Sequence, residues 1–284
     1  MKSSVKSIGP QNIKEVEFFL ARFEESAQFL INNLKAHGPT LNDHHNSGNF
    51  KVIKNDGKIT SVFCLARRGN LYVQSTLNEP NLILEECEKE SVPLKGFIGD
   101  WNSVEPVYRL FKERTPSYSP SYESKEILYS YELKESDTKI KHDSRVRFLE
   151  LRDFPQWYEF SKAYMAELSL PDELGMEQKR KDFESQIANK VWWGLFDGEK
   201  LISRTALNSK GEKIGQVGGV FTPKDFRQKG FAKAVMFHML KDCRDLHGHE
   251  KSILFTGETD FPAQKLYESM GYNHIGSFAL VLGK

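Results

Sequence analysis

The chain has 284 residues, of which 39% are hydrophobic and 28% charged, and its formal net charge is +1. This length suits two domains of a soluble globular protein, and the near-neutral charge excludes a broad basic surface for nucleic acid. No uncharged apolar run approaches the roughly twenty residues of a membrane span, and the N-terminus lacks an apolar signal core. The three scattered cysteines, Cys64, Cys87 and Cys243, are typical of free thiols. We therefore expect a cytoplasmic protein without nucleic-acid or membrane partners.

Residues 1–133 predict one α+β domain. Apolar residues recur at helical spacing between Asn12 and Lys35, where we expect a single helix. A polar segment then contains His44 and His45, but no Cys, His or Asp spacing nearby completes a metal site, so we predict a loop without a metal. The other predicted elements are strands at 50–54, 58–67, 70–75, 94–98 and 125–133 and helices at 82–90 and 103–112.

Residues 134–144 are polar and charged with one apolar residue, which predicts a linker. The second domain is predicted over 145–284. Its elements are strands at 146–151, 191–196, 201–208, 213–222, 252–256 and 274–282 and helices at 154–167, 176–189, from Ala232, and before Gly271. The last strand is a continuous apolar run, so we expect it to close the sheet of this domain and to be buried on both faces.

The turn after strand 213–222 has a specific chemistry. Pro223 ends the strand because it has no N–H to donate, and a segment from Arg227 to Ala232 leads into the next helix. The first N–H groups of a helix have no internal partner and lie at the positive end of its dipole. With Gly230 beside them and Arg227 and Lys229 adding charge, the turn predicts an anion cradle that suits a pyrophosphate. It lacks the spacing of a P-loop and of a dinucleotide fingerprint.

Two motifs in this half resemble the GNAT family of N-acetyltransferases. Arg227-x-x-Gly230-x-Ala232, after a strand ending Gly-Val-Phe-Thr-Pro, is similar to the family's acyl-CoA-binding motif. The segment 260–272 is similar to its later motif, Asn-x-x-Ala-x-x-Leu-Tyr-x-x-x-Gly-Phe/Tyr, with Asp in place of the Asn. The resemblance implies an α/β (α+β) fold of two GNAT-like domains, each a mixed, mostly antiparallel sheet flanked by helices. The first domain lacks the cradle turn and would be degenerate; an unrelated α+β domain is the alternative.

The resemblance also implies the residues of the site. The acyl-CoA-binding residues are Val220, Phe221, Thr222, Arg227, Gln228, Lys229, Gly230, Phe231, Ala232, Lys233 and Asp260. Backbone groups of 220–222 would bind the pantetheine arm, and those of 228–233 the pyrophosphate. Tyr267 is implied as the catalytic acid, because a phenol can protonate the departing CoA thiolate. Gly218 and Gly219 either admit the ligand close to the strand or form a β-bulge without a ligand role.

The residues do not identify a general base. Some relatives carry a Glu eleven residues before the cradle arginine, where this chain has Gln216. An amide cannot accept a proton at neutral pH. Glu167 and Glu258 are candidates by location alone, and surface carboxylates are the alternative. Arg204 interrupts an apolar strand and would pair either with an acceptor carboxylate or with a carboxylate of the protein.

The function expected from these features is transfer of an acetyl group from acetyl-CoA to a primary amine of a small molecule or amino acid, without a metal. The two-domain layout and the Gly-Val-Phe-Thr-Pro strand are similar to glycine N-acyltransferase-like members of the family. The alternative is a CoA-binding regulatory or scaffold protein without turnover, which the amide at Gln216 would fit. Transfer to an alcohol is a third alternative, but it needs a strong base, and the sequence near the motifs contains no His–Asp pair.

Overall fold

The computed structural model describes residues 3–134, 143–170, 172 and 174–283, and the chain divides into two compact units. Unit 1 contains Met1–Tyr129, Phe255–Phe261 and His274–Lys284, and unit 2 contains Ser130–Leu254 and Pro262–Asn273. Most of the predicted linker lies outside the described residues, so that interpretation stays a prediction. Among the helices that the structure describes, none combines the length and the hydropathy needed to cross a bilayer.

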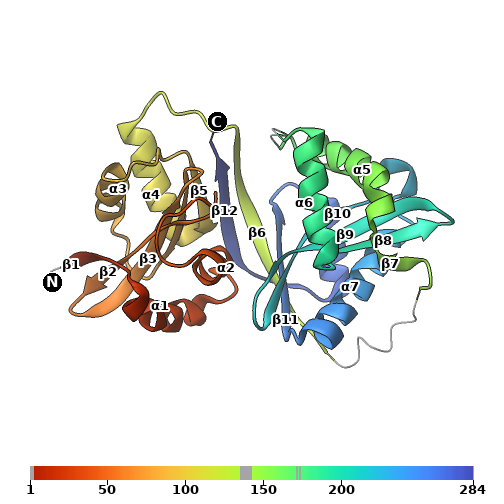
Figure 1. Ribbon diagram of the computed structural model, residues 1–284, viewed down its shortest axis with the longest axis horizontal. Helices are drawn as coiled ribbons and strands as arrows, with labels where there is room; N and C mark the ends of the chain where they lie inside the picture. The colour runs from red at the N-terminus through yellow and green to blue at the C-terminus, as the bar shows by residue number, and fades with distance from the viewer. Residues whose placement is uncertain (1–2, 135–142, 171, 173, 284) are drawn as a thin grey trace. The chain divides into compact units, whose positions relative to one another are not determined.

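Unit 1 is a mixed α/β unit whose strands lie in the order β1-β2-β3-β4-β5-β12-β6 (Figure 1). Strands β1 to β4 pair antiparallel, and β4 pairs parallel with β5. The elements are β1 (Ser3–Ser7), α1 (Ile13–Leu20), α2 (Gln28–His37), β2 (Gly48–Asn55), β3 (Lys58–Ala66), β4 (Asn70–Ser75), α3 (Pro80–Glu88), β5 (Gly96–Asp100), α4 (Trp101–Arg114), β6 (Tyr122–Glu132) and β12 (Asn273–Leu282).

Both faces of the unit 1 sheet are buried. Side chains alternate between the faces of a strand, so Val62 and Cys64 of β3 pack in the core under α1 and α2, whereas Phe63 packs in the core under α3 and α4. Each fully buried side chain of this size contributes roughly 1.5–3 kcal/mol. The two cores hold the unit together as three layers, helices on each side of one sheet (Figure 1).

The last strand of the chain belongs to unit 1, and the sequence prediction that it closes the sheet of the second domain is wrong. β12 pairs antiparallel with β5, and Phe278 lies opposite Asp100 and Val281 opposite Phe97. The expected burial on both faces is confirmed, because Phe278 packs in one core of unit 1 and Val281 in the other. The physical reason for the error is that an apolar pattern predicts burial but not which sheet edge the strand joins.

Two further predictions for the first half need correction. The expected helix from Asn12 to Lys35 is interrupted, because the chain turns after Phe23, whose carbonyl accepts the N–H groups of Ser26 and Ala27. The helical spacing of apolar residues continues across this turn, so the sequence pattern does not reveal that the helix is interrupted. Strand β1 was not predicted, because Val5 is the only apolar residue in its sequence.

Unit 2 is a second mixed α/β unit, with strand order β11-β10-β9-β8-β7 (Figure 1). Strands β7 to β10 pair antiparallel, and β10 pairs parallel with β11. The elements are β7 (Val146–Phe148), α5 (Phe154–Glu167), α6 (Met176–Ala188), β8 (Trp192–Asp197), β9 (Lys200–Lys210), β10 (Ile214–Phe221), α7 (Phe231–His247), β11 (Lys251–Gly257) and α8 (Phe261–Met270), the last two of which also contribute residues to unit 1.

The two neighbouring tryptophans of β8 show the layers of unit 2. Trp192 packs in the core formed with α5 and α6. Trp193 points to the opposite face, where its Nε1 donates to Asp242 of α7 at 2.7 Å. Five apolar residues of α7 are buried, namely Val235, Met236, Met239, Leu240 and Cys243. The sheet therefore lies between α5 and α6 on one side and α7 on the other.

The cysteines are buried free thiols, as the sequence predicted. Burial raises the pKa of each thiol, that of Cys87 to about 12, because the thiolate would lose its hydration. Such thiols stay protonated and pack as small apolar side chains.

Candidate functional site

The end of strand β10 lies beyond its parallel pairing. The register joins Ile214–Gln216 to Lys251–Ile253 of β11, whereas β10 continues to Phe221. On its other edge β10 pairs with β9, with register shifts between Gln216 and Val217 and between Gly218 and Phe221. Backbone groups at the end of a strand can bind an extended amide-bearing ligand. The residues from Val217 to Phe221 therefore offer such a strand end.

The glycines of β10 are required by neighbouring side chains of the protein itself. A Cβ on Gly218 would lie 1.9 Å from Nδ2 of Asn208, and one on Gly219 would lie 2.7 Å from Cη2 of Trp192. Gly219 also has a φ of +59°, in the left-handed region. The register shift between Gly218 and Phe221 is a β-bulge or a similar irregularity, and a ligand role of these glycines stays a prediction.

Gly219→Ala is expected to lower the free energy of unfolding by about 2–4 kcal/mol, because it adds left-handed strain to an overpacked contact with Trp192. Chemical denaturation of the full chain measures this change. Gly198→Ala, at a turn with φ +58° and no atom within 4 Å of the added Cβ, controls for the strain alone and should cost about 1–2 kcal/mol. Equal losses in the two variants would contradict the packing argument.

The turn after β10 presents an open helix N-terminus. A short 3₁₀ turn at Lys224–Phe226 follows Pro223, and Gln228 and Gly230 adopt left-handed φ values of +61° and +79°. No side chain caps α7 at Gly230, and a Cβ placed there would meet nothing within 4 Å. The first N–H groups of this long helix therefore lie beside open space at the positive end of the dipole, as an anion cradle requires.

Basic side chains in and after the turn bind other groups of the protein. Arg227 donates from Nε to the carbonyl of Thr222 at 2.8 Å and pairs through Nη2 with Glu167 of α5 at 2.6 Å. Lys229 donates to the carbonyl of Asp225, and Lys233 donates to the carbonyl of Ser269 on α8 at 2.9 Å. Arg227 thus fixes the turn against β10 and α5. Exposed positive charge in this turn comes from Lys224 and Lys229.

Tyr267 is a buried residue of α8. Its side chain is 7% exposed, and its ring lies 6.0 Å from that of Tyr272. The Tyr272 hydroxyl bonds to Ser252 at 2.8 Å, and burial raises its pKa well above the ordinary value. Because Lys233 joins α8 to α7, Tyr267 and the cradle belong to one connected part of unit 2.

Asp260 and Glu258 belong to unit 1, whereas the other predicted site residues belong to unit 2. Asp260 accepts from the Thr256 hydroxyl at 3.4 Å, and Glu258 pairs with Lys125 at 3.2 Å. All other predicted acyl-CoA-binding residues lie along the end of β10, its turn and the first turn of α7.

The candidate bases are occupied or unsuitable. Glu167 and Glu258 each form an ion pair. Gln216 is 1% exposed, and its Nε2 is buried without a hydrogen-bond partner. A buried amide donor without a partner is costly, and a bound water can satisfy it.

Arg204 of β9 is buried without a carboxylate partner. It is 1% exposed, and its Nη1 donates to the Trp157 carbonyl at 3.2 Å and to the Ser161 hydroxyl at 2.8 Å. Among the residues that the structure describes, no carboxylate pairs with it, so the expected ion pair with a protein carboxylate is not found there. The sequence could not reveal Trp157 and Ser161, because helix α5 brings them to Arg204 from more than forty residues away.

Three histidines of unit 1, His37, His44 and His45, stack on one another. The His44 ring lies 3.8 Å from that of His37 and 4.3 Å from that of His45. Burial and the neighbouring His44 lower the pKa of His37. In the described part of the chain there is no cluster of three or more potential ligands.

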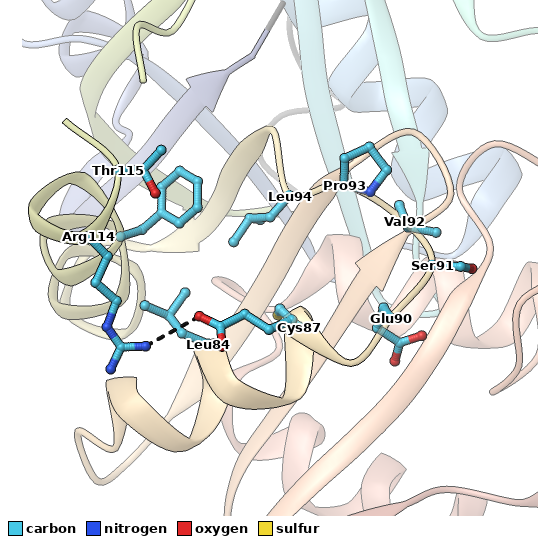
Figure 2. Close-up of a pocket in the computed structure, with 11 residues that line it drawn as sticks. Leu84, Cys87, Glu90, Ser91, Val92, Pro93, Leu94, Arg114 and Thr115 are labelled. Atoms are coloured by element: carbon cyan, nitrogen blue, oxygen red, sulfur yellow. Dashed lines mark hydrogen bonds and ion pairs between the residues drawn. The ribbon is translucent and has the colours of Figure 1, made fainter. Parts of the chain in front are cut away.

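A pocket of about 420 Å³ lies in unit 1 between the C-terminal ends of α3 and α4 and the segment before β5 (Figure 2). Apolar side chains such as Leu84 and Leu94 line it, and Arg114 pairs with Glu88 at its edge at 3.4 Å. None of the predicted site residues lines this pocket.

The sequence similarity to a known family covers the turn after β10 and helix α7 of unit 2. The model of the acetyltransferase (GNAT) family matches residues 154–272. An uncharacterized N-acetyltransferase, YsnE of Bacillus subtilis, is 32% identical over 91 residues, which are 31% of this chain and 60% of the relative. The chain thus covers about three fifths of this curated relative.

Solved structures share the fold of the whole chain. A GCN5-related N-acetyltransferase from Sphaerobacter thermophilus aligns with a TM-score of 0.61 and 12% identity, covering 98% of this chain and 94% of the other. A tandem GNAT protein from the clavulanic acid biosynthesis pathway aligns with a TM-score of 0.52 and 10% identity, covering 99% and 97%. At these low identities, the similarity to the solved structures shows a shared fold alone. Over residues 154–272 the chain is therefore similar to the acetyltransferase (GNAT) family.

Proposed function

We propose that the chain transfers an acetyl group from acetyl-CoA to a primary amine of a small molecule or amino acid. The observation that carries this proposal is the uncapped N-terminus of α7 at Gly230, which follows shortly after the end of β10 that extends beyond its parallel register with β11. A strand end for the pantetheine arm and a helix N-terminus for the pyrophosphate suit two consecutive parts of one CoA molecule. The family match over 154–272 supports the same donor.

The residues of unit 2 would divide the chemistry between them. Backbone N–H groups near Val220 stabilise the oxyanion that forms when the amine attacks the thioester carbonyl. Tyr267 gives its hydroxyl proton to the sulfur of the departing CoA thiolate. No carboxylate replaces Gln216 as base, so we propose that the amine loses its proton to water, with one water held by the Gln216 amide.

We propose that unit 1 is a degenerate copy of the same fold. In both units three antiparallel strands lead through a helix to a parallel strand, as β2-β3-β4-α3-β5 and as β8-β9-β10-α7-β11. The connection before α3 contains no glycine, and Glu79 stands at its N-cap. A carboxylate at this position repels a phosphate, so unit 1 would not bind CoA. This layout is similar to that of glycine N-acyltransferase-like proteins.

The test is CoA release from acetyl-CoA by the full chain, measured with and without a panel of primary amines. We expect release above the background of hydrolysis with at least one amine, and binding of acetyl-CoA by calorimetry. Binding without release for any amine would instead support a CoA-binding scaffold, which the ion-paired carboxylates Glu167 and Glu258 favour. Absence of both binding and release would contradict the two functions together.

A further inference from the structure

Arg204 is held on the sheet face that α5 covers. It lies opposite Phe221 of β10 and opposite Gly194 of β8, and cross-strand partners share a face of the sheet. Its guanidinium carbon lies 4.6 Å from the ring centre of Trp192 and 5.6 Å from that of Trp157. The charge therefore sits in an aromatic environment next to the residue that ends β10.

The hydrogen bonds of this guanidinium leave it incompletely satisfied. An arginine has five N–H donors, and the acceptors here are one carbonyl and one hydroxyl, both on Nη1. Its Nε is buried without a partner. Burying an ion costs several kcal/mol when no opposite charge compensates it. Burial lowers the pKa of Arg204 to about 9, so the side chain still carries its charge at neutral pH.

Three other buried ions of the chain pair with an opposite charge, whereas Glu126 is buried with the Tyr122 hydroxyl as a donor, and its burial raises the pKa of that carboxyl. Lys51 pairs with Glu90 at 2.8 Å, Asp153 with Arg147 at 2.7 Å, and Lys179 with Asp172. Arg204 differs from them, because the described residues provide no anion for it. Arg204 is buried with donors that no described acceptor satisfies, and this geometry points to an anionic ligand.

The position of Arg204 indicates which ligand that is. Phosphate groups of CoA would lie at the exposed cradle around Gly230, at the start of α7. Arg204 lies instead on the α5 face, one strand away from the backbone proposed to hold the thioester, so a group bound there belongs to the acceptor. Arginine recognises carboxylates through two parallel hydrogen bonds.

We propose that Arg204 binds the carboxylate of the acceptor, which makes the acceptor an amino acid or another small amine with a carboxylate. This inference rests on the proposed acetyl transfer. Because the guanidinium is 1% exposed, the carboxylate reaches it by displacing α5 side chains such as Tyr164, whose ring centre lies 6.0 Å from the guanidinium carbon. Nε and Nη2 then donate to the carboxylate, while Ser161 and Trp157 keep Nη1 in place.

The test compares matched acceptors that differ only in charge, an amino acid and its carboxamide, in the CoA-release assay. We expect the wild type to prefer the amino acid by about 10- to 100-fold in kcat/KM. Arg204→Met should remove this preference while retaining a melting temperature at least equal to that of the wild type, because an apolar replacement of a buried ion is often stabilising. Arg180→Met removes an exposed cation from the Phe154 ring and should keep the preference.

Two further measurements test carboxylate binding without relying on the Arg204→Met variant or on turnover. Short carboxylates without an amine should inhibit the wild type competitively against the amino acid, and their amides should not, which needs no variant. Calorimetry of amino-acid binding in the presence of CoA tests the inference even if no amine is acetylated. Equal use of amino acids and amides, or a preference that survives in Arg204→Met, would overturn the role of Arg204 and leave acetyl transfer standing. Failure of CoA release with every amine would overturn acetyl transfer itself.

Discussion

Gly230→Glu is expected to abolish acetyl-CoA binding in a protein that still folds. The position has a φ of +79°, so a side chain there costs about 1–2 kcal/mol, but a Cβ meets no atom within 4 Å. The glutamate can therefore be accommodated, and its carboxylate occupies the open space beside the first N–H groups of α7. There it competes with the pyrophosphate for those groups and repels it. We expect the Kd for acetyl-CoA to rise at least about 100-fold, which corresponds to about 2.7 kcal/mol.

Thermal unfolding with and without acetyl-CoA measures this effect. A ligand at about a hundred times its Kd adds roughly 2.7 kcal/mol of stability, and each kcal/mol raises the midpoint by about 2–4 °C in a protein of this size. The wild type should therefore gain about 5–10 °C, and Gly230→Glu should gain almost nothing.

The same helix supplies a matched control. Gly248 ends α7 with a φ of +68°, and a Cβ there also meets nothing within 4 Å. Gly248→Glu thus introduces the same strain and the same charge at the opposite end of α7, where no anion is expected to bind. It should keep the full ligand-induced shift. A Gly230→Glu variant that also keeps the shift would show that acetyl-CoA does not use the cradle.

The cradle could be predicted from the sequence because its parts are local. Strand β10, its turn and the start of α7 follow one another directly, so glycine, proline and helical periodicity determine the geometry together. The placement of β12 could not be predicted in this way. Its apolar run specifies burial, whereas the choice of β5 as partner depends on residues more than 170 positions earlier.

The environment of Arg204 is a second feature that depends on residues distant in the sequence and could not be predicted. The sequence indicated an arginine in an apolar strand and left two partners open. The actual neighbours come from α5 and β8, and only the packing of these elements shows that the described residues supply aromatic rings and no carboxylate. Glu167 illustrates the converse, because its pairing with Arg227 sixty residues away removes a candidate base that location alone had suggested.

Tyr267→Phe is the second change with a large expected effect, and it acts on the chemical step. The phenyl ring keeps the packing against Tyr272, whereas the hydroxyl that would protonate the CoA thiolate is lost. General-acid catalysis contributes at least about 100-fold, so we expect kcat to fall by about that factor while the Kd for acetyl-CoA stays within about twofold. Steady-state kinetics between pH 6 and pH 10, together with calorimetry, separate the two quantities.

The control for this change is the neighbouring buried tyrosine. Tyr272→Phe removes the hydrogen bond to Ser252 and should cost about 1 kcal/mol of stability, with turnover retained. The two variants are therefore expected to show opposite patterns, since one hydroxyl serves the reaction and the other serves the fold. If Tyr267→Phe turned over as fast as the wild type at every pH, the thiolate would receive its proton from water. The remaining catalysis would then come from backbone groups of β10 and from the positioning of the two substrates.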